Sequence, residues 1–460
     1  MIFGKYKELY FVGIGGSGMS GIAEILHNLG YKISGSDISA GEVTDHLSSL
    51  GVTIFDHHDG ANLGTANVVV ISSAVKEDNP EVVEARRQGI PVIKRAEMLG
   101  ELMRLKYSIG ISGTHGKTTT TSMLGKIMTD ARLDPTIIVG GIVAGKGSGA
   151  SLGAGDYLVA EADEFDRSFL SMFPSMAVIT NIEPDHLECY DGMDDLENSF
   201  LTYMNRVPFY GIVVYNADDP VLAKLRGKIT RASVNYGLSP DADYQAVDIR
   251  LSEHGSEFEL FHRGEHLGKI TLGVIGEHNV RNALAAAAAA LELEVDFVTI
   301  ADSLRNFRGV GRRFEIKAVV NDIMVVDDYA HHPTEIIATL GSAQKSYSRR
   351  IIAVFQPHLF SRTQLFYREF AEALRRADIC CLVDIFPSRE QPIPGVTAEM
   401  ISKYAETKGY NNIIYVGPKE NAVGRVLAEA RAGDMIITIG AGSITRINPD
   451  IVKGLKKNVS

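Results

Sequence analysis

The sequence predicts an α/β protein with three domains, each built around a largely parallel sheet. Short apolar runs rich in Val and Ile alternate with helical patterns through most of the chain, as in repeated β–α–β units. The length of 460 residues suits about three domains of roughly 150 residues each. A hydrophobic content of 45% and a charged content of 22% are those of an ordinary globular protein.

The first domain is predicted at residues 1–105. Its apolar runs are short and bounded by helical patterns, as expected for strands buried between helices. The expected strands are Leu9–Gly13, Lys32–Ser34, Val68–Ser72 and Pro91–Ile93, and the expected helices are Met19–Leu29, Glu42–Leu50 and Glu81–Gln88.

The second domain is predicted at residues 106–311 and begins with a strand at Ser108–Ser112 and a helix from Lys117. Polar and apolar residues alternate over 244–272, which indicates antiparallel strands added to the parallel core. The glycine-rich stretch Gly140–Gly155 is interpreted as a flexible surface loop. Further strands are expected at Ile137–Val139, Tyr157–Ala160, Ala177–Thr180 and Ile212–Tyr215, and a helix at Glu277–Leu293 whose alanines Ala285–Ala290 pack on a sheet.

A third α/β domain is predicted at residues 312–460, because the alternation of apolar runs and helical patterns restarts there. Its expected strands are Ile323–Val326, Ile351–Phe355, Ile379–Val383, Ile413–Val416 and Met435–Ile439.

Charge and cysteine content indicate a reducing, cytoplasmic compartment. The net charge of −11 argues against non-specific nucleic-acid binding, which needs a basic face. The three cysteines, Cys189, Cys380 and Cys381, do not form the pattern of a disulfide framework. No apolar run approaches the roughly 20 residues that span a bilayer, and the N-terminus lacks the apolar core of a signal peptide. We therefore expect no nucleic-acid partner and no membrane insertion.

A glycine motif follows the first predicted strand. The run Gly13-Ile14-Gly15-Gly16-Ser17-Gly18 matches G-x-G-x-x-G directly before a helix. Glycines let the backbone approach a diphosphate, and a helix N-terminus offers it N–H groups. Asp37 ends the next strand, where a ribose-binding acid is expected. The motif predicts a diphosphate ligand, with NAD as the first guess and a tight turn without a ligand as the alternative.

A second phosphate motif links the strand Ser108–Ser112 to the following helix. Its residues are Gly113, Thr114, His115, Gly116, Lys117, Thr118 and Thr119. In such loops backbone N–H groups cradle a β-phosphate, the lysine reaches the β/γ oxygens and a threonine hydroxyl can bind Mg²⁺. The strict G-x-x-x-x-G-K-[ST] form is not met, because Ile111 stands where the first glycine should be. The shorter loop predicts an ATP-type site, with a plain helix cap as the alternative.

Acidic and polar residues follow two further strands of the second domain. Glu161-Ala162-Asp163-Glu164 ends one strand, where carboxylates suit Mg²⁺ coordination. Glu161 is the best-placed ligand, whereas for Asp163, and more so for Glu164, a helix cap or a solvated charge run is the alternative. His186 closes the run Thr180-Asn181-Ile182-Glu183-Pro184-Asp185-His186 and is a candidate for a second metal or for the substrate.

Three polar clusters complete the set of motifs. Asn279 and Asn282 lie one helical turn apart and can match an adenine edge, with capping as an equal alternative. The runs Asp327–Pro333 and Phe355–Thr363 each follow a predicted strand, and Arg362 is a candidate clamp for a carboxylate. Taken alone, either run is equally well explained as a loop network.

Together these motifs resemble the Mur ligase family, the ATP-dependent amide-bond enzymes of peptidoglycan precursor synthesis. G-T-H-G-K-T-T-T, T-N-I-x-x-D-H, G-x-H-N-x-x-N and D-Y-A-H-H-P occur in that order, and the resemblance covers essentially the whole chain. The segments G-I-G-G-S-G-M-S, S-S-A-V and F-Q-P-H-x-x-S-R-T narrow it to the alanine-adding members. The resemblance implies an N-terminal Rossmann-like domain for a UDP-sugar, a central P-loop ATPase-like domain and a C-terminal Rossmann-like domain for the amino acid.

The resemblance also implies which residues hold each ligand. Asn279 and Asn282 would face the adenine of ATP, and Asp328 its ribose. The implied Mg²⁺ ligands are Thr118, Glu161 and His186. The implied UDP-sugar site comprises Gly15, Gly16, Ser17, Gly18, Met19, Ser20, Asp37, Ser72, Ser73 and Ala74. The residues implied to frame the amino acid are Tyr329, His331 and Arg362.

The implied reaction joins L-alanine to the carboxylate of UDP-N-acetylmuramate. ATP would transfer its γ-phosphate to that carboxylate, and the amine of L-alanine would then displace phosphate from the acyl phosphate. Two anions meet in the first step, so Lys117 and Mg²⁺ would offset charge. Arg312 or Arg313 would reach the phosphates on domain closure. His331 or His332 is the candidate base for the amine.

Two segments depart from the pattern of relatives. Alanine-adding members commonly read P-H-R-Y-S-R-T where this chain has Leu359 and Phe360, so its amino-acid pocket carries less positive charge. The loss of this arginine puts the preference of the pocket for alanine over serine or glycine in question. Several sister ligases carry a metal-bridging carbamylated lysine, but Tyr190–Phe200 contains no lysine, and we expect none here.

Three other classes of protein predict different behaviour. An NAD-dependent oxidoreductase would have no use for ATP. A sister ligase that attaches a preformed peptide to UDP-N-acetylmuramate in cell-wall recycling would need a roomier amine pocket. A non-enzymatic nucleotide-binding module would tolerate Lys117→Ala. For the assembly we expect a monomer or a weak homodimer.

Overall fold

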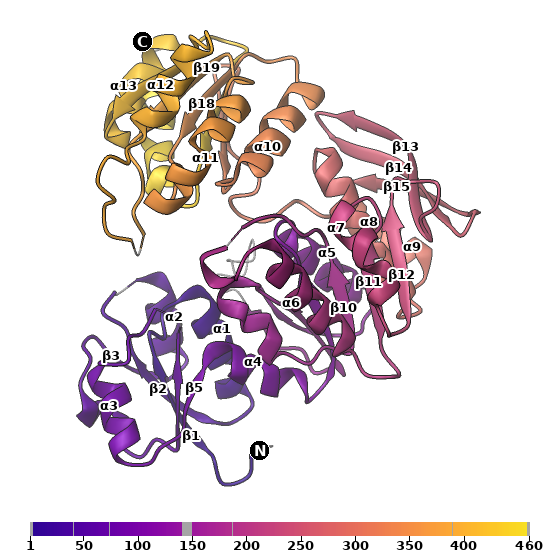
Figure 1. Ribbon diagram of the computed structural model, residues 1–460, viewed down its shortest axis with the longest axis vertical. Coiled ribbons are helices and arrows are strands. Elements are labelled where there is room, and N and C mark those ends of the chain that lie inside the picture. The colour runs from indigo at the N-terminus through magenta and orange to yellow at the C-terminus, as the bar shows by residue number, and fades with distance from the viewer. Residues whose placement is uncertain are drawn as a thin grey trace. The chain divides into compact units, whose positions relative to one another are not determined.

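The described residues form three β-sheets. The computed structural model describes residues 3–39, 41–72, 74–139, 150–185, 187–388 and 390–457, without the side chains of Ser17 and Glu188. The chain divides into two compact units, the first comprising Met1–Ile249, Glu257–Leu272 and Asn279–Phe307 and the second Arg250–Ser256, Gly273–His278 and Arg308–Ser460. The N-terminal and central sheets belong to the first unit, apart from the tips of two strands, and the C-terminal sheet belongs to the second (Figure 1).

The N-terminal sheet has five parallel strands in the order β3-β2-β1-β4-β5, which confirms the predicted Rossmann-like arrangement. Alternate residues of β1 face opposite sides: Leu9 and Phe11 pack in one cluster with α1, α2 and α4, and Tyr10 and Val12 in another with α3 and η1. The elements are β1 (Glu8–Val12), α1 (Ser17–Asn28), β2 (Lys32–Ser36), α2 (Glu42–Ser49), β3 (Thr53–Phe55), η1 (Gly60–Leu63), β4 (Val68–Ile71), α3 (Pro80–Arg87), β5 (Val92–Lys94) and α4 (Arg95–Met103).

A buried carboxylate joins four elements on the α3 side of this sheet. Glu81 is fully buried and accepts hydrogen bonds from Tyr10 Oη at 2.6 Å and Ser36 Oγ at 2.8 Å. His58 Nδ1 lies 2.9 Å away and Asn62 Nδ2 lies 3.3 Å away. Burial and the neighbouring carboxylate raise the pKa of Tyr10 above its ordinary value, so the phenol keeps its proton and donates it. Each carboxylate oxygen is therefore satisfied by side-chain donors.

The Glu81→Gln substitution is expected to destabilise the first unit by about 1–3 kcal/mol, because an amide N–H₂ would face donors that need an acceptor. Urea unfolding followed by circular dichroism measures this change. Glu84→Gln is the matched control on the same helix, since Glu84 bonds to the surface partners Arg87 and Gln88. Equal stability of the two variants would contradict the role of the buried network.

The central sheet has ten strands in the order β15-β14-β13-β12-β11-β10-β6-β9-β7-β8. The strands from β13 to β7 run parallel, and β8 is antiparallel to β7. Two-residue connections after β13 and β14 can join only antiparallel neighbours, and Arg263 and Gly264 both have the positive φ that such a turn requires. The predicted parallel core with added antiparallel strands is confirmed. The strands are β6 (Tyr107–Ser112), β7 (Thr136–Ile138), β8 (Ala150–Ser151), β9 (Tyr157–Glu161), β10 (Met176–Ile179), β11 (Ile212–Asn216), β12 (Ser233–Gly237), β13 (Tyr244–Ser252), β14 (Gly255–His262) and β15 (Glu265–Leu272).

Helices complete the core of the central domain. The alanines Ala285–Ala290 of α8 are fully buried, as predicted from their small size. Phe200 and Tyr203 of α6 pack against Phe169 with ring centroids 5.0 and 5.1 Å apart. The helices are α5 (Lys117–Asp130), η2 (Phe165–Ser171), η3 (Leu187–Cys189), α6 (Met193–Asn205), α7 (Pro220–Leu225), η4 (Arg226–Lys228), α8 (Glu277–Leu291) and α9 (Phe297–Arg305).

The prediction of a flexible loop at Gly140–Gly155 is wrong for residues 150–155. Residues 140–149 lie outside the described residues. Ala150 and Ser151 pair with β7 as β8. Lys106 Nζ donates to the carbonyls of Gly153 and Gly155, each at 2.7 Å. A Cβ on Gly153 would lie 2.1 Å from the carbonyl of Asp134. These glycines serve close backbone packing, which composition alone does not distinguish from flexibility.

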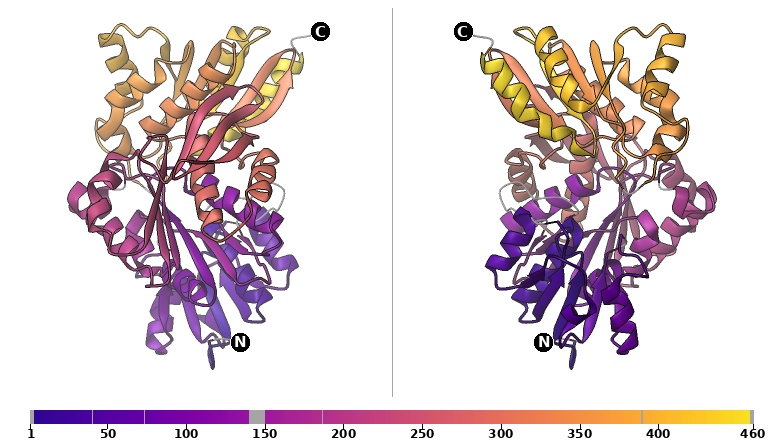
Figure 2. Two further views of the ribbon diagram at one scale, coloured as in Figure 1. Left: turned by 90° about the vertical axis from the view of Figure 1, so that its right-hand side faces the viewer. Right: turned by 90° about the vertical axis from the view of Figure 1, so that its left-hand side faces the viewer.

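The C-terminal sheet has the order β16-β17-β21-β18-β19-β20 and is parallel except for β16 at its edge. One face packs on α10, α11 and α12 and the other on α13 and α14, so helices flank both faces (Figure 2). The predicted third α/β domain is confirmed, with β16 as an unpredicted addition. The elements are β16 (Glu315–Val320), β17 (Ile323–Asp328), α10 (Pro333–Ser346), β18 (Ile351–Phe355), α11 (Phe360–Leu374), β19 (Ile379–Val383), α12 (Glu399–Thr407), β20 (Ile413–Gly417), α13 (Lys419–Glu429), β21 (Met435–Ile439), η5 (Ser443–Ile447) and α14 (Asn448–Lys457).

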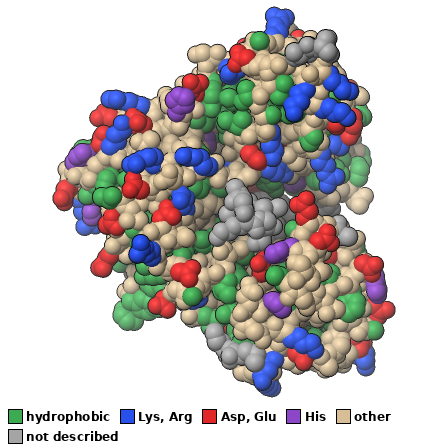
Figure 3. All heavy atoms as spheres, turned by 180° about the vertical axis from the view of Figure 1, so that it is seen from behind, with side chains coloured by type: hydrophobic (Ala, Val, Ile, Leu, Met, Phe, Trp, Pro, Cys, Tyr) green, Lys and Arg blue, Asp and Glu red, His purple; other side chains and the backbone are tan. Residues whose placement is uncertain are grey.

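Charged side chains of both signs are mixed on the face of the molecule seen in Figure 3. Among the residues described, no helix combines the length and the apolar character needed to cross a membrane.

Candidate functional site

The phosphate loop Gly113–Lys117 joins β6 to α5 and has little room for side chains. Gly113 has φ 132° and Gly116 has φ 86°, both in the region that favours glycine. A Cβ on Gly113 would lie 2.1 Å from Thr180 Oγ1, and one on Gly116 would lie 2.4 Å from Asn282 Oδ1. The backbone itself therefore lines the start of α5, which is the geometry that binds phosphate.

Lys117 begins α5 and carries the cation of the loop. Its ammonium donates to the carbonyl of Gly113 at 2.6 Å and to Glu164 Oε2 at 2.7 Å, with a longer contact to the carbonyl of Thr114 at 3.3 Å. Burial alone would lower the pKa of Lys117, but the charges of Glu164 and Asp163 outweigh it and raise that pKa above its ordinary value. Lys117 is therefore a permanent positive charge at the loop.

The segment after β10 braces the phosphate loop. The side chain of Asn181 accepts a hydrogen bond from the N–H of His115 at 2.9 Å and donates one to the carbonyl of His115 at 3.0 Å. Thr180 Oγ1 donates to the same carbonyl at 2.6 Å, and Thr114 Oγ1 accepts from the N–H of Glu183 at 2.8 Å. The polar strand end predicted from sequence thus fixes the conformation of the loop, a role that the sequence did not predict.

The two asparagines of α8 lie beside the same loop. Asn282 is 7% exposed, and its Oδ1 accepts from Thr120 Oγ1 at 3.4 Å. Its Nδ2 donates to Asn279 Oδ1 at 3.3 Å, and Asn279 is half-buried. Asn282 therefore supports the loop from within, while Asn279 is the more exposed of the pair.

The predicted metal ligands are brought together only in part. Glu161 is the last residue of β9 and lies opposite Ile111 of β6, the strand that leads into the phosphate loop. Thr118 lies in the first turn of α5, and both residues are half-buried. A hydroxyl and a carboxylate at a phosphate loop are hard oxygen donors that suit Mg²⁺. His186 lies outside the described residues.

The first glycine loop lies at the carboxyl edge of the N-terminal sheet. Its Gly15 N–H donates to Asp37 Oδ2 at 2.8 Å, so Asp37 closes the loop from the neighbouring strand. A Cβ on Gly18 would lie 3.0 Å from Arg95 Nη1, which places the Arg95 guanidinium at the first turn of α1. Ser72 follows β4 on the other side, with a Cβ on Gly13 3.5 Å from its Oγ. The loop thus combines backbone, a helix N-terminus and a cation.

The other predicted residues of this loop differ in exposure. Gly16 precedes α1, Met19 and Ser20 of that helix are buried, and Ala74 is exposed. Ser73 and the side chain of Ser17 are not among the described residues.

In the second unit, two aspartates end β17 and organise the chain before β16. Asp328 is 6% exposed and accepts hydrogen bonds from the N–H groups of Phe314 and Ala330, each at 2.8 Å. Burial raises the pKa of Asp328 to about 6. Asp327 pairs with Arg312 Nε at 3.2 Å. The predicted ribose acid Asp328 is thus also a structural anchor.

The two candidate arginines lie over one aromatic ring. The guanidinium of Arg312 is 4.8 Å and that of Arg313 is 5.2 Å from the ring centroid of Tyr329. Arg312 Nη2 also donates to the carbonyl of Gly440 at 2.6 Å, and Arg313 Nη1 donates to Glu335 Oε1 at 3.4 Å. Both cations are therefore oriented within their own unit.

The two histidines have different tautomers. His331 Nδ1 lies 3.0 Å from the carbonyl of Tyr329 and 3.3 Å from Glu335 Oε2, two acceptors that require a proton on Nδ1. His332 Nδ1 instead accepts from the N–H of Thr334 at 3.4 Å and caps α10, so its proton lies on Nε2. When both rings are neutral, Nε2 therefore carries the lone pair in His331 and the proton in His332. The sequence alone does not distinguish the two rings.

The run after β18 places a third histidine ring beside His331. His358 lies 5.8 Å from His331, measured between ring centroids. Arg362 is in the first turn of α11 and is 6% exposed. Leu359 is 4% exposed with φ 69°, so a buried leucine with a left-handed backbone conformation precedes α11.

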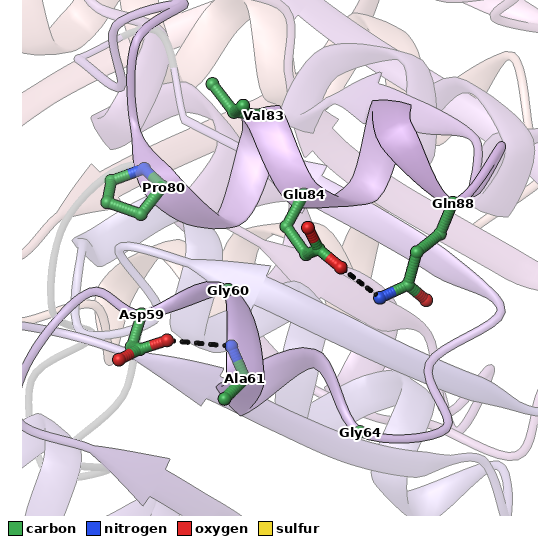
Figure 4. A pocket seen from close by; sticks show the side chains of 8 residues that line it. All are labelled: Asp59, Gly60, Ala61, Gly64, Pro80, Val83, Glu84 and Gln88. Atoms are coloured by element: carbon green, nitrogen blue, oxygen red, sulfur yellow. Dashed lines mark hydrogen bonds between the residues drawn. The ribbon is translucent and has the colours of Figure 1, made fainter.

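A surface groove between η1 and α3 shares no residue with these motifs (Figure 4). Its acidic groups are bonded to near neighbours: Asp59 accepts from the N–H of Ala61 at 2.8 Å, and Glu84 accepts from Gln88 at 2.6 Å. The groove is therefore lined by a different set of residues from the phosphate loops.

The contacts of two charged residues with the glycine loops were not predicted. Glu164 is 1% exposed and ion-paired with Lys117, so its interpretation as a solvated charge is wrong. Its place at a strand end beside the phosphate loop was the signal for a role in the site. Arg95 lies at the start of α4, and its sequence context gave no signal.

Three family profiles match successive parts of the chain. The profile of the Mur ligase family catalytic domain matches residues 8–107, that of the Mur ligase middle domain 111–290, and that of the Mur ligase glutamate ligase domain 312–442. Because these matches span most of its length, the chain belongs to the Mur ligase family. The predicted family and the predicted class of ATP-dependent amide-bond ligase are confirmed.

Relatives and solved structures agree with this assignment. Proteins named UDP-N-acetylmuramate–L-alanine ligase from Geobacter sp. (strain M21) and Geotalea daltonii are each 48% identical over 456 residues, which is 99% of this chain and 99–100% of theirs. The crystal structure of UDP-N-acetylmuramate-alanine ligase from Thermotoga maritima has a TM-score of 0.83 at 29% identity, over 98% of this chain and 99% of that one. A murein peptide ligase from Psychrobacter arcticus has a TM-score of 0.71 at 26% identity, over 98% and 99% of the two chains.

Proposed function

We propose that this chain joins L-alanine to the lactyl carboxylate of UDP-N-acetylmuramate, with conversion of ATP to ADP and phosphate, in cytoplasmic peptidoglycan precursor synthesis. The observation that carries the proposal is the presence of two glycine-lined phosphate loops on separate sheets, of which only one contains a lysine. Two polyanionic substrates need two such loops, whereas a nicotinamide-dependent oxidoreductase has no use for the second. The names of the relatives at 48% identity support the same substrates.

We propose domain boundaries at residues 1–105, 106–311 and 312–460. Helix α4 ends at Met103 and β6 begins at Tyr107, and Arg312 precedes the first strand of the C-terminal sheet. The N-terminal domain would hold the UDP-sugar, with its diphosphate at Gly15–Ser20 and the cation of Arg95 beside it. The central domain would bind ATP and the C-terminal domain the amino acid.

The first chemical step must overcome repulsion between two anions. A carboxylate is a poor electrophile, and its oxygen would attack the γ-phosphate of ATP to form an acyl phosphate. Lys117 would bind the β/γ oxygens and offset the charge that builds up there. Thr118 and Glu161 would hold Mg²⁺, which supplies further charge compensation when bound.

The second step needs a neutral amine. His331 Nε2 would take the proton of the L-alanine ammonium, because Nδ1 keeps its own proton for the carbonyl of Tyr329. The amine then attacks the acyl carbon, and phosphate leaves with the oxygen that it took from the carboxylate. Arg362 would bind the carboxylate of the amino acid.

The test is ADP release in the presence of ATP, Mg²⁺ and UDP-N-acetylmuramate, with each candidate amine in turn. L-alanine should give the highest kcat/KM, with L-serine and glycine as the closest competitors because Leu359 replaces an arginine. A tripeptide substrate tests the recycling ligase in the same assay. Turnover that is no higher with L-alanine than with the other amines, or that does not need the UDP-sugar, would overturn the proposal.

A further inference from the structure

We propose that Glu164 is a positioning residue that competes with the phosphates of ATP for the Lys117 ammonium. This inference rests on the proposed role of Lys117 at the β/γ oxygens. Glu164 is a buried carboxylate that we do not propose as a Mg²⁺ ligand. The inference assigns it a function in nucleotide binding.

The hydrogen-bonding capacity of Lys117 is already used. An ammonium has three N–H donors. Three acceptors surround it: the carbonyl of Gly113 at 2.6 Å, the carbonyl of Thr114 at 3.3 Å and Glu164 Oε2 at 2.7 Å. A phosphate oxygen can therefore bind Lys117 only if one of these acceptors gives up or shares its donor.

Glu164 is the acceptor whose charge opposes that exchange. The two carbonyls are neutral and belong to the loop itself, whereas the carboxylate is anionic, and the side chain of Glu164 is 1% exposed. With so little water to screen it, its charge acts strongly on a second anion brought to the same ammonium. The free energy of nucleotide binding should therefore include the cost of separating or sharing this ion pair.

The backbone around Glu164 holds the carboxylate in place. Tyr190 Oη donates to the carbonyl of Glu164. Arg167 pairs with Asp195 and donates through Nε to the carbonyl of Cys189 at 3.0 Å. These contacts fix the backbone at Glu164 and in the turn after it, so the buried carboxylate is presented to Lys117 from a fixed position.

The same ion pair should orient the lysine once the nucleotide is bound. A long lysine side chain loses considerable conformational freedom when it is held at one point. Glu164 holds the ammonium beside the carbonyls of Gly113 and Thr114, and this restraint would keep the cation directed at the phosphoryl group during transfer. Removing the carboxylate should therefore strengthen nucleotide binding and slow the chemical step.

The test uses Glu164→Gln, which keeps the size of the side chain and removes its charge. Calorimetric titration with the β,γ-imido analogue of ATP and Mg²⁺, without the other substrates, should give a Kd lowered by about fivefold to tenfold. Steady-state assays should show kcat lowered by about tenfold, with the KM for UDP-N-acetylmuramate unchanged. Because the titration needs neither the UDP-sugar nor the amine, its outcome is independent of the proposed substrates.

Glu197→Gln is the matched control, since Glu197 is a largely buried carboxylate of the same domain, paired with Lys224 at 2.6 Å. It should leave the Kd for the ATP analogue unchanged. Glu164→Asp, with a shorter side chain and the same charge, is the second variant if Glu164→Gln does not fold, and its Kd should be lowered by a smaller factor. Unchanged or weaker binding of the analogue by the folded Glu164 variant would overturn the competition with phosphate.

Discussion

Replacing Lys117 with alanine will lower kcat by about 10³-fold or more, because a single cation at the transferred phosphoryl group contributes on this scale. The ammonium is held at the loop by the carbonyl of Gly113 and by Glu164, and its raised pKa keeps it charged throughout the physiological range. Binding of UDP-N-acetylmuramate should change by less than about twofold, since its loop lies on a different sheet. Stopped assays of ADP release and calorimetric titration with the UDP-sugar measure the two quantities.

Lys126→Ala is the matched control for this prediction. Lys126 lies on the same helix α5 and pairs with Asp130 at the surface at 2.8 Å. This variant should retain the activity of the unmodified protein. If Lys117→Ala abolished both turnover and UDP-sugar binding while remaining folded, the assignment of the two phosphate loops to two ligands would fail.

Replacing His331 with alanine will lower kcat by about 10²–10³-fold, the usual contribution of a general base. Without the ring, only amine that is already neutral can attack, so the low rate of the variant should keep rising with pH as the ammonium of L-alanine loses its proton to solvent. Steady-state assays at a series of pH values measure both effects. The groups that face His331 are Tyr329, Glu335 and His358, with Arg313 acting through Glu335.

His332→Asn tests the assignment of the base to one ring. Asparagine accepts hydrogen bonds well at a helix N-cap, so it can replace His332 Nδ1 at the N–H of Thr334. This variant should keep a kcat close to that of the unmodified protein. A strongly lowered kcat in His332→Asn, with kcat retained in His331→Ala, would place the base at His332.

Much of the fold could be predicted because buried parallel strands leave a strong signal. Most strands in the centre of each sheet are short runs of Val and Ile between helical patterns, and the strands that were predicted lie within one or two residues of their observed bounds. Strands β3 and β12 were not predicted, because β3 has only three residues and β12, with the sequence SVNYG, lacks a continuous apolar run. Edge strand β16 was missed because Ile316 and Val319 are exposed and a bulge between Ile316 and Ala318 interrupts the alternation. Helix α4 was missed because Gly100 weakens its helical pattern, although that glycine lets the helix approach Ser171 closely.

The candidate site could be predicted where it depends on position along the chain. Gly113, Glu161 and Thr180 follow neighbouring strands of one sheet, so the carboxyl ends of those strands bring them together. What could not be predicted depends on contacts between distant segments. The ion pair of Glu164 with Lys117 was neither the metal coordination considered for this strand end nor the alternative of a cap or a solvated charge, and the contact of Asn282 with the loop at Gly116 was not predicted.

The tautomers of the histidines illustrate the same limit. His331 and His332 are adjacent in the sequence and chemically identical there. Only the carbonyl of Tyr329 beside one ring and the N–H of Thr334 beside the other assign the protons. Such assignments require the three-dimensional arrangement of backbone groups, which no sequence pattern specifies.

In the proposed mechanism the γ-phosphate of ATP is transferred to the lactyl carboxylate before the amine attacks. The most direct measurement uses UDP-N-acetylmuramate labelled with oxygen-18 in both carboxylate oxygens, incubated with ATP, Mg²⁺ and L-alanine. Mass spectrometry of the released inorganic phosphate should find one labelled oxygen in each molecule, because the bond that breaks in the second step joins carbon to that oxygen. Phosphate without label, formed together with the amide product, would contradict the acyl-phosphate mechanism.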